Sequence, residues 1–335
     1  MESVAQCIQR SGMFLRRRDL LARGYRDADI RRSLATRRIF RVRQGWYSVP
    51  SAPEPAIRAV RVGGRLTGVS ALETYGLRVP LRDHVDVAVP ENACRLRRPG
   101  QRREALRPSD GIRVHWSDSR REQHASRWRV TLDDALLAVL VLESRDVAIA
   151  CASAVMRYKR WSPARLRAVF ARAPQRVHCW FALVSALDDS HGETFVRLRF
   201  RDAGIWFEQQ PAVEGVGRLD FRVSPHVYIE VDGGQHDPSW SGEGGSTYEH
   251  DHDRDAELAA RNGRSLRWTY RQLYSRWPQC VAALEAAVAD DLELIARRMQ
   301  HPAPPRVLAP LRQQHRLRKR RGSRANAPPT GVSRH

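Results

Sequence analysis

The clearest pattern of hydrophobic and polar positions in this chain lies between residues 218 and 233. Apolar and polar residues alternate from Arg218 to Val223 and again from Val227 to Gly233, with a Ser-Pro-His segment between the two runs. A period of two predicts strands with one buried face, and the intervening residues predict a tight turn. We therefore expect an antiparallel hairpin whose core-facing residues are Leu219, Phe221, Val223, Val227, Ile229 and Val231.

The other face of this hairpin is acidic. Asp220 lies on the first strand, and Glu230 and Asp232 lie on the second, where alternate side chains share a face. Three carboxylates on one face repel each other, and a hard divalent ion such as Mg²⁺ (or Mn²⁺) would stabilise them. The pattern predicts a metal site formed by these three residues. The alternative is a solvent-facing hairpin with ordinary surface acids.

Other elements flank the hairpin. A helix is predicted from Ser190 toward Asp202, with Gly204 at its end, and strands are predicted at 205–209 and 265–270. Ser190 and Glu193 have the spacing of a capping box, which makes Glu193 a candidate cap partner. His236 follows a Gly-Gly turn after the hairpin, so its imidazole can return to the acidic face.

These elements resemble, in order and spacing, a domain family related to the very-short-patch-repair (Vsr) endonucleases, within the PD-(D/E)xK nuclease superfamily. The resemblance covers residues 185–290. It implies a restriction-endonuclease-like mixed sheet flanked by helices, and metal-dependent hydrolysis of DNA phosphodiester bonds. The matching segments are Ser190-x-x-Glu193, Leu219-Asp220-Phe221, Ile229-Glu230-Val231-Asp232-Gly233-x-x-His236 and Asp251-x-x-Arg254-Asp255-x-x-Leu258.

The resemblance assigns roles to these residues. Glu193 becomes the helix acid, Asp220 and Glu230 become metal ligands, and Arg254 contacts the scissile phosphate. The superfamily usually has a Lys two residues after the second strand acid, but this chain has Asp232 there, and its two lysines lie elsewhere. His236 is the candidate substitute for the general base, and Asp232 is alternatively a further metal ligand.

A second pattern lies in the first 50 residues. Residues 16–22 and 27–36 predict two helices, the second with Ile30 and Leu34 on its inner face, and residues 39–49 predict a hairpin. Together they predict a winged helix-turn-helix whose second helix enters the DNA major groove. The alternative is a small structural domain with a solvated basic face. The candidate groove or phosphate contacts are Arg26, Arg31 and Arg32, and Arg41 and Arg43 belong to the wing.

This segment resembles the N-terminal domain of AbiEi-type antitoxins and related transcriptional regulators. The matching residues are Arg18-x-x-Leu21, Ile30-x-x-x-Leu34 and Val42-x-x-Gly45-x-Tyr47. Shorter matches continue at residues 66–72, 76–77 and 84–90. The resemblance implies DNA binding and repression of the protein's own operon, and with it a cognate toxin or operon partner.

The charge of the chain is unevenly distributed. The 335 residues carry a net charge of +21, with twelve Arg against four acids in residues 1–50 and nine basic residues without an acid in residues 301–335. Basic ends are typical of a protein that binds a polyanion. The expected domains are a winged helix-turn-helix at 1–50, an AbiEi-like, α-rich β/α connector at 51–180 with helices at 135–142 and 147–157, a Vsr-like nuclease domain at 181–298 and a disordered basic tail at 299–335.

The remaining features narrow the class of protein. The apolar stretch at 135–142 is too short to span a bilayer, and no signal peptide begins the chain, so no membrane partner is expected. Five widely spaced cysteines fit neither a zinc motif nor a disulfide framework, which indicates a cytoplasmic protein. No pattern predicts an oligomeric state.

Two hypotheses follow for this multidomain α+β and α/β protein. The first is a DNA-binding protein with a Mg²⁺-dependent endonuclease domain. The second is an antitoxin-like transcriptional regulator whose nuclease-like domain is catalytically inactive. The missing Lys favours the second hypothesis, and the retained Asp220, Glu230 and His236 favour the first.

Overall fold

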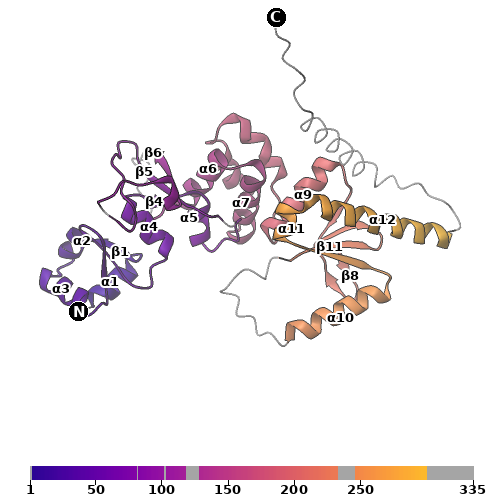
Figure 1. The fold of residues 1–335 in the computed structure, drawn as a ribbon, viewed down its shortest axis with the longest axis horizontal. Helices are drawn as coiled ribbons and strands as arrows, with labels where there is room; N and C mark the ends of the chain where they lie inside the picture. Colours follow the sequence, from indigo (N-terminus) through magenta and orange to yellow (C-terminus); the bar gives the residue numbers. More distant parts are fainter. Residues whose placement is uncertain (1, 81, 102, 118–127, 233–245, 300–335) are drawn as a thin grey trace, which may run out of the picture. The chain divides into compact units, whose positions relative to one another are not determined.

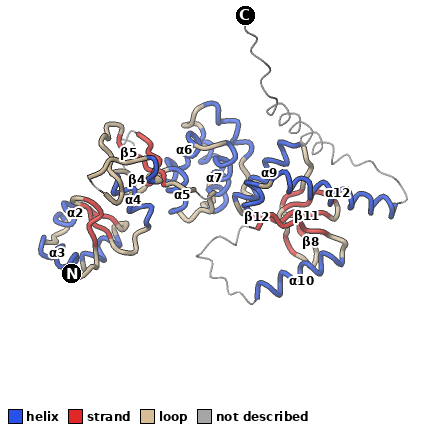
Figure 2. The backbone as a smooth tube through the Cα atoms, in the orientation of Figure 1, coloured by secondary structure: helices blue, strands red, loops and turns tan. Residues whose placement is uncertain are grey.

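The computed structural model describes residues 2–80, 82–101, 103–117, 128–232 and 246–299, with side chains in the last segment from 252 to 297. The chain forms two compact units that divide between Ala186 and Leu187. Each unit combines helices with small mixed sheets, which agrees with the expected α+β class (Figures 1 and 2). His236 and the predicted tail at 299–335 are not among the residues whose side chains the structure describes.

The N-terminal part of the first unit consists of three helices and a three-stranded antiparallel sheet in the order β1-β3-β2. The helices predicted at 16–22 and 27–36 and the hairpin predicted at 39–49 are confirmed. In chain order the elements are α1 (Val4–Arg10), β1 (Phe14–Arg16), α2 (Arg17–Ala22), α3 (Asp27–Ala35), β2 (Phe40–Arg43) and β3 (Trp46–Ser48).

Two of these elements, α1 and β1, have no counterpart in the sequence-based expectations. α1 has only seven residues, which is too short for a clear helical period. Gly12 and Met13 both have positive φ and end α1, and Phe14 then begins a strand that pairs with β3 and leads directly into α2. Ile8 and Leu15 are fully buried and pack with Ile30 in one core.

The second part of the first unit combines a small sheet with a group of helices. The sheet has the order β4-β5-β6, with β5 parallel to β6. The helices predicted at 135–142 and 147–157 are confirmed and slightly longer, since Thr131 caps the first of them. The elements are α4 (Glu54–Val62), β4 (Arg65–Leu66), α5 (Gly68–Thr74), β5 (Val85–Pro90), η1 (Pro108–Asp110), β6 (Ile112–Ser117), α6 (Leu132–Leu142), α7 (Arg145–Tyr158), α8 (Pro163–Phe170) and η3 (Gln175–Leu183).

The second unit is built on a four-stranded mixed sheet in the order β12-β11-β10-β7. β12 is parallel to β11, and the other neighbours are antiparallel. The helix predicted from Ser190, the hairpin and the strand at 265–270 are confirmed. The elements are α9 (His191–Ala203), β7 (Glu208–Gln209), β8 (Ala212–Val213), β9 (Gly217–Arg218), β10 (Phe221–Ser224), β11 (Val227–Asp232), α10 (Ser246–Ala260), β12 (Arg264–Thr269), α11 (Tyr270–Ser275) and α12 (Trp277–Met299).

Helices cover both faces of this sheet (Figure 1). On one face α9, α11 and α12 enclose a core that includes Phe200, Phe221, Ile229 and Leu284. On the other face α10 places Leu258 in a smaller cluster with strand residues. The face predicted to be acidic is therefore partly covered by a helix.

Two details of the hairpin prediction are wrong. Leu219 packs with Tyr228 and Leu258 on the α10 side, whereas Phe221 faces the opposite core. The alternation breaks here because β9 ends at Arg218 and β10 begins only at Phe221. The strand predicted at 205–209 is reduced to its last two residues, the only ones of that segment that pair with β10.

None of the helices within the described residues combines the length and apolar composition needed to cross a membrane. The five cysteines are free thiols; three are buried and two exposed.

Candidate functional sites

The N-terminus of α9 is anchored directly on β11. Ser190 caps the helix by accepting the backbone N–H of Glu193 at 3.2 Å, and Glu193 Oε2 accepts the backbone N–H of Asp189 at 2.9 Å. Glu193 is buried and acts as a cap partner, although not of Ser190 itself. A Cβ at Gly192 would lie 2.6 Å from Val231 Cγ1, which shows how closely the helix approaches the strand.

A buried ion pair that the sequence analysis missed fixes the start of α9. Asp188, with 2% of its surface exposed, accepts two hydrogen bonds from the Arg197 guanidinium, at 2.9 and 2.7 Å. It also accepts from Thr194 Oγ1 at 2.8 Å and from Gln209 Nε2 at 2.6 Å. The bond to Gln209 connects α9 to β7. The available signal was Arg197, a charged residue among the buried residues of α9, because a buried Arg requires an acidic partner.

Asp220 lies beside Glu230, as the hairpin register requires. Phe221 pairs with Ile229, so the residues next to them, Asp220 and Glu230, face each other across the two strands. The Asp220 carboxylate accepts the backbone N–H of Val231 at 2.7 Å. Burial, reinforced by the charge of Glu230, raises the pKa of Asp220 to about 6 in spite of that hydrogen bond. The structure thus brings two of the three predicted metal ligands together.

Glu230 is held by side chains from two other elements. Its Oε1 accepts the Ser265 hydroxyl at 2.8 Å and lies 3.7 Å from Arg267 Nε, and both of these residues are on β12. Its Oε2 lies 3.5 Å from Arg254 Nη2 on α10. Arg254 is itself fixed, because it donates to the backbone carbonyls of Val216 and Arg218, at 2.9 and 3.3 Å. Two guanidinium groups therefore supply positive charge beside Glu230.

Asp232 is not part of this close arrangement. It ends β11, opposite Thr269 of β12, and lies two residues beyond Glu230. Two residues of a strand span about 6.6 Å, which separates the two carboxylates along the sheet. Asp220, Glu230 and Asp232 do not bring three ligand atoms within 4.8 Å of one another, so the predicted three-carboxylate group is not assembled.

Four of the five predicted DNA-contacting arginines are exposed: Arg26, Arg31, Arg32 and Arg41. Arg43 differs, since it is half-buried and its Nη1 donates to the Val60 carbonyl of α4 at 3.4 Å. Burial lowers the pKa of Arg43. Its side chain therefore attaches the hairpin to α4. Directly after α3 the chain also exposes Arg37 and Arg38, which the sequence pattern did not single out.

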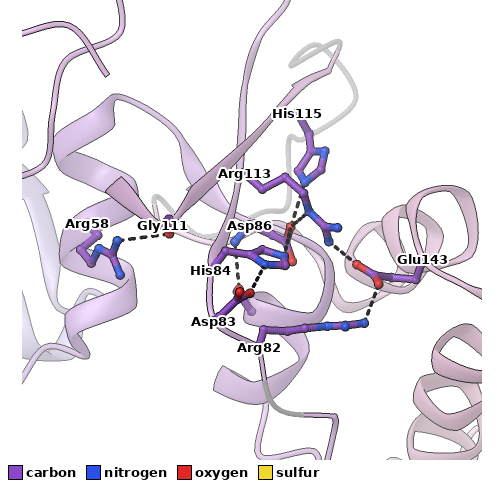
Figure 3. Close-up of polar contacts among 10 residues, drawn as sticks. Arg58, Arg82, Asp83, His84, Asp86, Gly111, Arg113, His115 and Glu143 are labelled. Carbon is purple, nitrogen blue, oxygen red and sulfur yellow. Dashed lines mark hydrogen bonds and ion pairs between the residues drawn. The ribbon is translucent and has the colours of Figure 1, made fainter. Parts of the chain in front are cut away.

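A second polar cluster lies on the β4-β5-β6 sheet (Figure 3). Asp86 of β5 is completely buried and accepts hydrogen bonds from Arg113 Nε at 2.6 Å and His115 Nε2 at 2.9 Å, both from β6. Glu143, which follows α6, forms ion pairs with Arg113 and with Arg82, the latter at 2.5 Å. His84 Nε2 lies 3.7 Å from Asp86 Oδ1.

This cluster contains the one group of potential metal ligands that the described part of the chain brings within 4.8 Å: His84, Asp86 and Glu143. The sequence analysis noted residues 84–90 only as a matching segment and assigned them no site. The signal was a polar residue at every second position of two neighbouring strands, His84 and Asp86 in one and Arg113 and His115 in the other.

Comparison of the chain with protein-family models finds no match, and comparison with curated proteins finds none either.

Proposed function

We propose that this protein binds DNA through its first 50 residues and hydrolyses DNA phosphodiester bonds at a metal-dependent site formed around Asp220 and Glu230. The observation that carries the proposal is the adjacency of these two carboxylates at the start of β10 and on β11, where burial and the charge of Glu230 raise the pKa of Asp220. Mutual repulsion of this kind favours a bound cation, and two carboxylates suit a hard divalent ion such as Mg²⁺ or Mn²⁺.

The topology of the second unit supports this proposal. Its chain order is helix, three antiparallel strands, helix and a fourth strand parallel to the third, if the short pair β8 and β9 is set aside. That order agrees with the restriction-endonuclease-like arrangement implied by the resemblance to Vsr-related domains. Gly192 in the first turn of α9 lies against Val231, the residue whose backbone N–H donates to Asp220, so Glu193 lies at the same end of the sheet.

Each polar residue has a distinct part in the proposed reaction. Asp220 and Glu230 hold the metal ion, which would polarise the phosphodiester and lower the pKa of the attacking water. Arg267 and Ser265 position Glu230. Arg254, fixed by two backbone carbonyls, is the contact for the scissile phosphate. His236 remains the proposed general base.

The first unit supports DNA binding. Its order of helix, strand, two helices and a hairpin, with the first strand paired to the hairpin, agrees with a winged helix-turn-helix. In such a domain α3 enters the major groove, and its exposed Arg31 and Arg32 are placed to contact bases or phosphates. Arg41 extends the basic surface to the hairpin.

A second candidate function is an antitoxin-like repressor with an inactive C-terminal unit. The observation that favours it is the neutralisation of Glu230 by Arg254 and Arg267, together with Asp232 at the usual Lys position. In this case guanidinium groups take the place of a metal ion as the cations beside the acidic pair.

Cleavage of DNA separates the two functions. We would incubate supercoiled plasmid and single-stranded DNA with the full-length protein and Mg²⁺ or Mn²⁺, and compare wild type with Asp220→Asn and Glu230→Gln. Glu293→Gln is the matched control, because Glu293 is an exposed acid of the same unit. Cutting by wild type and control but not by the two site variants would support the nuclease. DNA binding without cutting would support the repressor.

A further inference from the structure

The second polar cluster has the composition of a metal site of a different kind. His84, Asp86 and Glu143 offer one imidazole nitrogen and two carboxylates, with ligand atoms within 4.8 Å of one another. Ligands bound to one ion at about 2.1 Å lie at most about 4.2 Å apart, so only a small side-chain adjustment is needed. Imidazole with carboxylates suits Zn²⁺ or Mn²⁺ better than Mg²⁺ or Ca²⁺, which prefer oxygen alone.

The hydrogen bonding of His84 leaves one ring nitrogen without a partner. Its Nδ1 lies 2.8 Å from Asp83 Oδ1. A carboxylate on Nδ1 places the ring proton there and leaves the lone pair on Nε2. Nε2 is buried, has no hydrogen-bond partner and faces Asp86 Oδ1 at 3.7 Å. A carboxylate behind a histidine whose other nitrogen is available is the usual support of a metal-bound imidazole.

Asp86 also has an unsatisfied atom. Its side chain is completely buried, and Oδ2 has no hydrogen-bond partner. Its other oxygen, Oδ1, accepts hydrogen bonds from His115 and Arg113. A Cβ at Gly68, where φ is +55°, would lie 3.1 Å from Oδ2. A larger residue than glycine would therefore crowd this buried oxygen, which has no hydrogen-bond partner, an arrangement that is costly without a ligand.

The two arginines lower the affinity of such a site without filling it. Arg82 and Arg113 each bind one oxygen of Glu143, and a carboxylate offers about four lone-pair positions. Each Glu143 oxygen thus retains acceptor capacity. The alternative is a self-contained ion-pair network in which two guanidinium groups balance two carboxylates. That network satisfies Glu143 but neither Nε2 of His84 nor Oδ2 of Asp86.

We propose that His84, Asp86 and Glu143 bind one divalent transition-metal ion of the Zn²⁺ or Mn²⁺ class, with Asp83 as the positioning residue for His84. The proposal concerns the first unit and does not depend on DNA cleavage by the second. His115, 2.9 Å from Asp86, supports the carboxylate through a hydrogen bond.

The test is a titration of full-length, chelator-treated protein with Zn²⁺, followed by calorimetry. Wild type should bind one equivalent of Zn²⁺ more than His84→Gln. Asp220→Asn should still bind this equivalent at the site of His84, Asp86 and Glu143. Zn²⁺ bound elsewhere on the chain cancels in this comparison. Asp83→Asn, a substitution of an exposed side chain, should weaken the same equivalent by about 10- to 100-fold. Co²⁺ gives an independent signal, since imidazole ligation changes its visible absorption.

His84→Gln should fold normally, because that side chain is on the rim of the cluster with 22% of its surface exposed. Circular dichroism and the melting temperature check this. Equal Zn²⁺ stoichiometry and affinity in wild type and His84→Gln, with matching Co²⁺ spectra, would overturn the metal site and leave the ion-pair network.

Discussion

The buried pair of Asp188 and Arg197 provides a quantitative test of how the second unit is held together. Asp188 accepts four hydrogen bonds while 2% exposed, and the Arg197 side chain is 5% exposed. Replacing one member leaves a buried charge without its partner. This typically lowers the free energy of unfolding by about 3–5 kcal/mol. We therefore expect Asp188→Leu and Arg197→Met each to destabilise the second unit by that amount.

The double variant Asp188→Leu/Arg197→Met should cost much less than the sum of the two single changes. An apolar pair of similar volume avoids the cost of removing both charges from water, so the replacement is often close to neutral. Urea denaturation measures the effect, and the transition that shifts identifies the second unit, since a chain of two units need not unfold in one step. Single-variant changes below about 1 kcal/mol would refute the argument, because that is the size expected of a solvent-exposed pair.

Three further predictions follow from individual residues. Gly192→Ala should lower the stability of the second unit by about 1–3 kcal/mol, because its Cβ would overlap two side chains; Gly100→Ala, in open space, should leave the melting temperature unchanged. The raised pKa of Asp220 should make the second unit less stable as pH rises from about 4 through about 6, because this carboxyl ionises less readily in the folded state than in the unfolded state. Melting temperatures measured over this pH range should show the loss in wild type and not in Asp220→Asn. Arg31→Ala and Arg32→Ala should each weaken duplex DNA binding. The slope of log binding constant against log salt concentration should fall by about 0.9 for each phosphate that the variant no longer neutralises. Unchanged slopes, measured by fluorescence anisotropy, would show that these residues do not contact the DNA.

Elements with strong local signals could be predicted from the sequence. Ser190 and Gly204 bound α9 because a hydroxyl caps the first turn and a glycine in the left-handed region ends the last. The hairpin at β10 and β11 followed from its alternation. α1 and β1 could not be predicted in this way, because short elements have weak periods and β1 depends on pairing with a strand thirty residues further along the chain.

The same division applies to the candidate site. The adjacency of Asp220 and Glu230 follows from strand period and register, both of which are local properties of the hairpin. The approach of Arg254 and Arg267 to Glu230 depends on how α10 and β12 pack on the sheet, which no local pattern encodes. The cluster around Asp86 likewise required the parallel register of β5 and β6.

Arg254 and Arg267 neutralise the charge of Glu230 but leave the Asp220 carboxylate unfavourable. The two proposed functions differ in whether a metal ion removes this remaining cost. The two arginines compensate Glu230, yet the pKa of Asp220 stays raised to about 6, so part of the repulsion and burial cost persists. A divalent ion would remove it by favouring the ionised carboxylate. Because the raised pKa favours the protonated carboxyl, metal binding near pH 6 should release a proton from part of the Asp220 population. Calorimetry in buffers of different ionisation enthalpy measures this release. If Mg²⁺ or Mn²⁺ binds with release of protons, and the release disappears in Asp220→Asn, the nuclease is supported. If no metal ion binds at this pair, the guanidinium groups are its permanent counter-ions and the repressor is favoured.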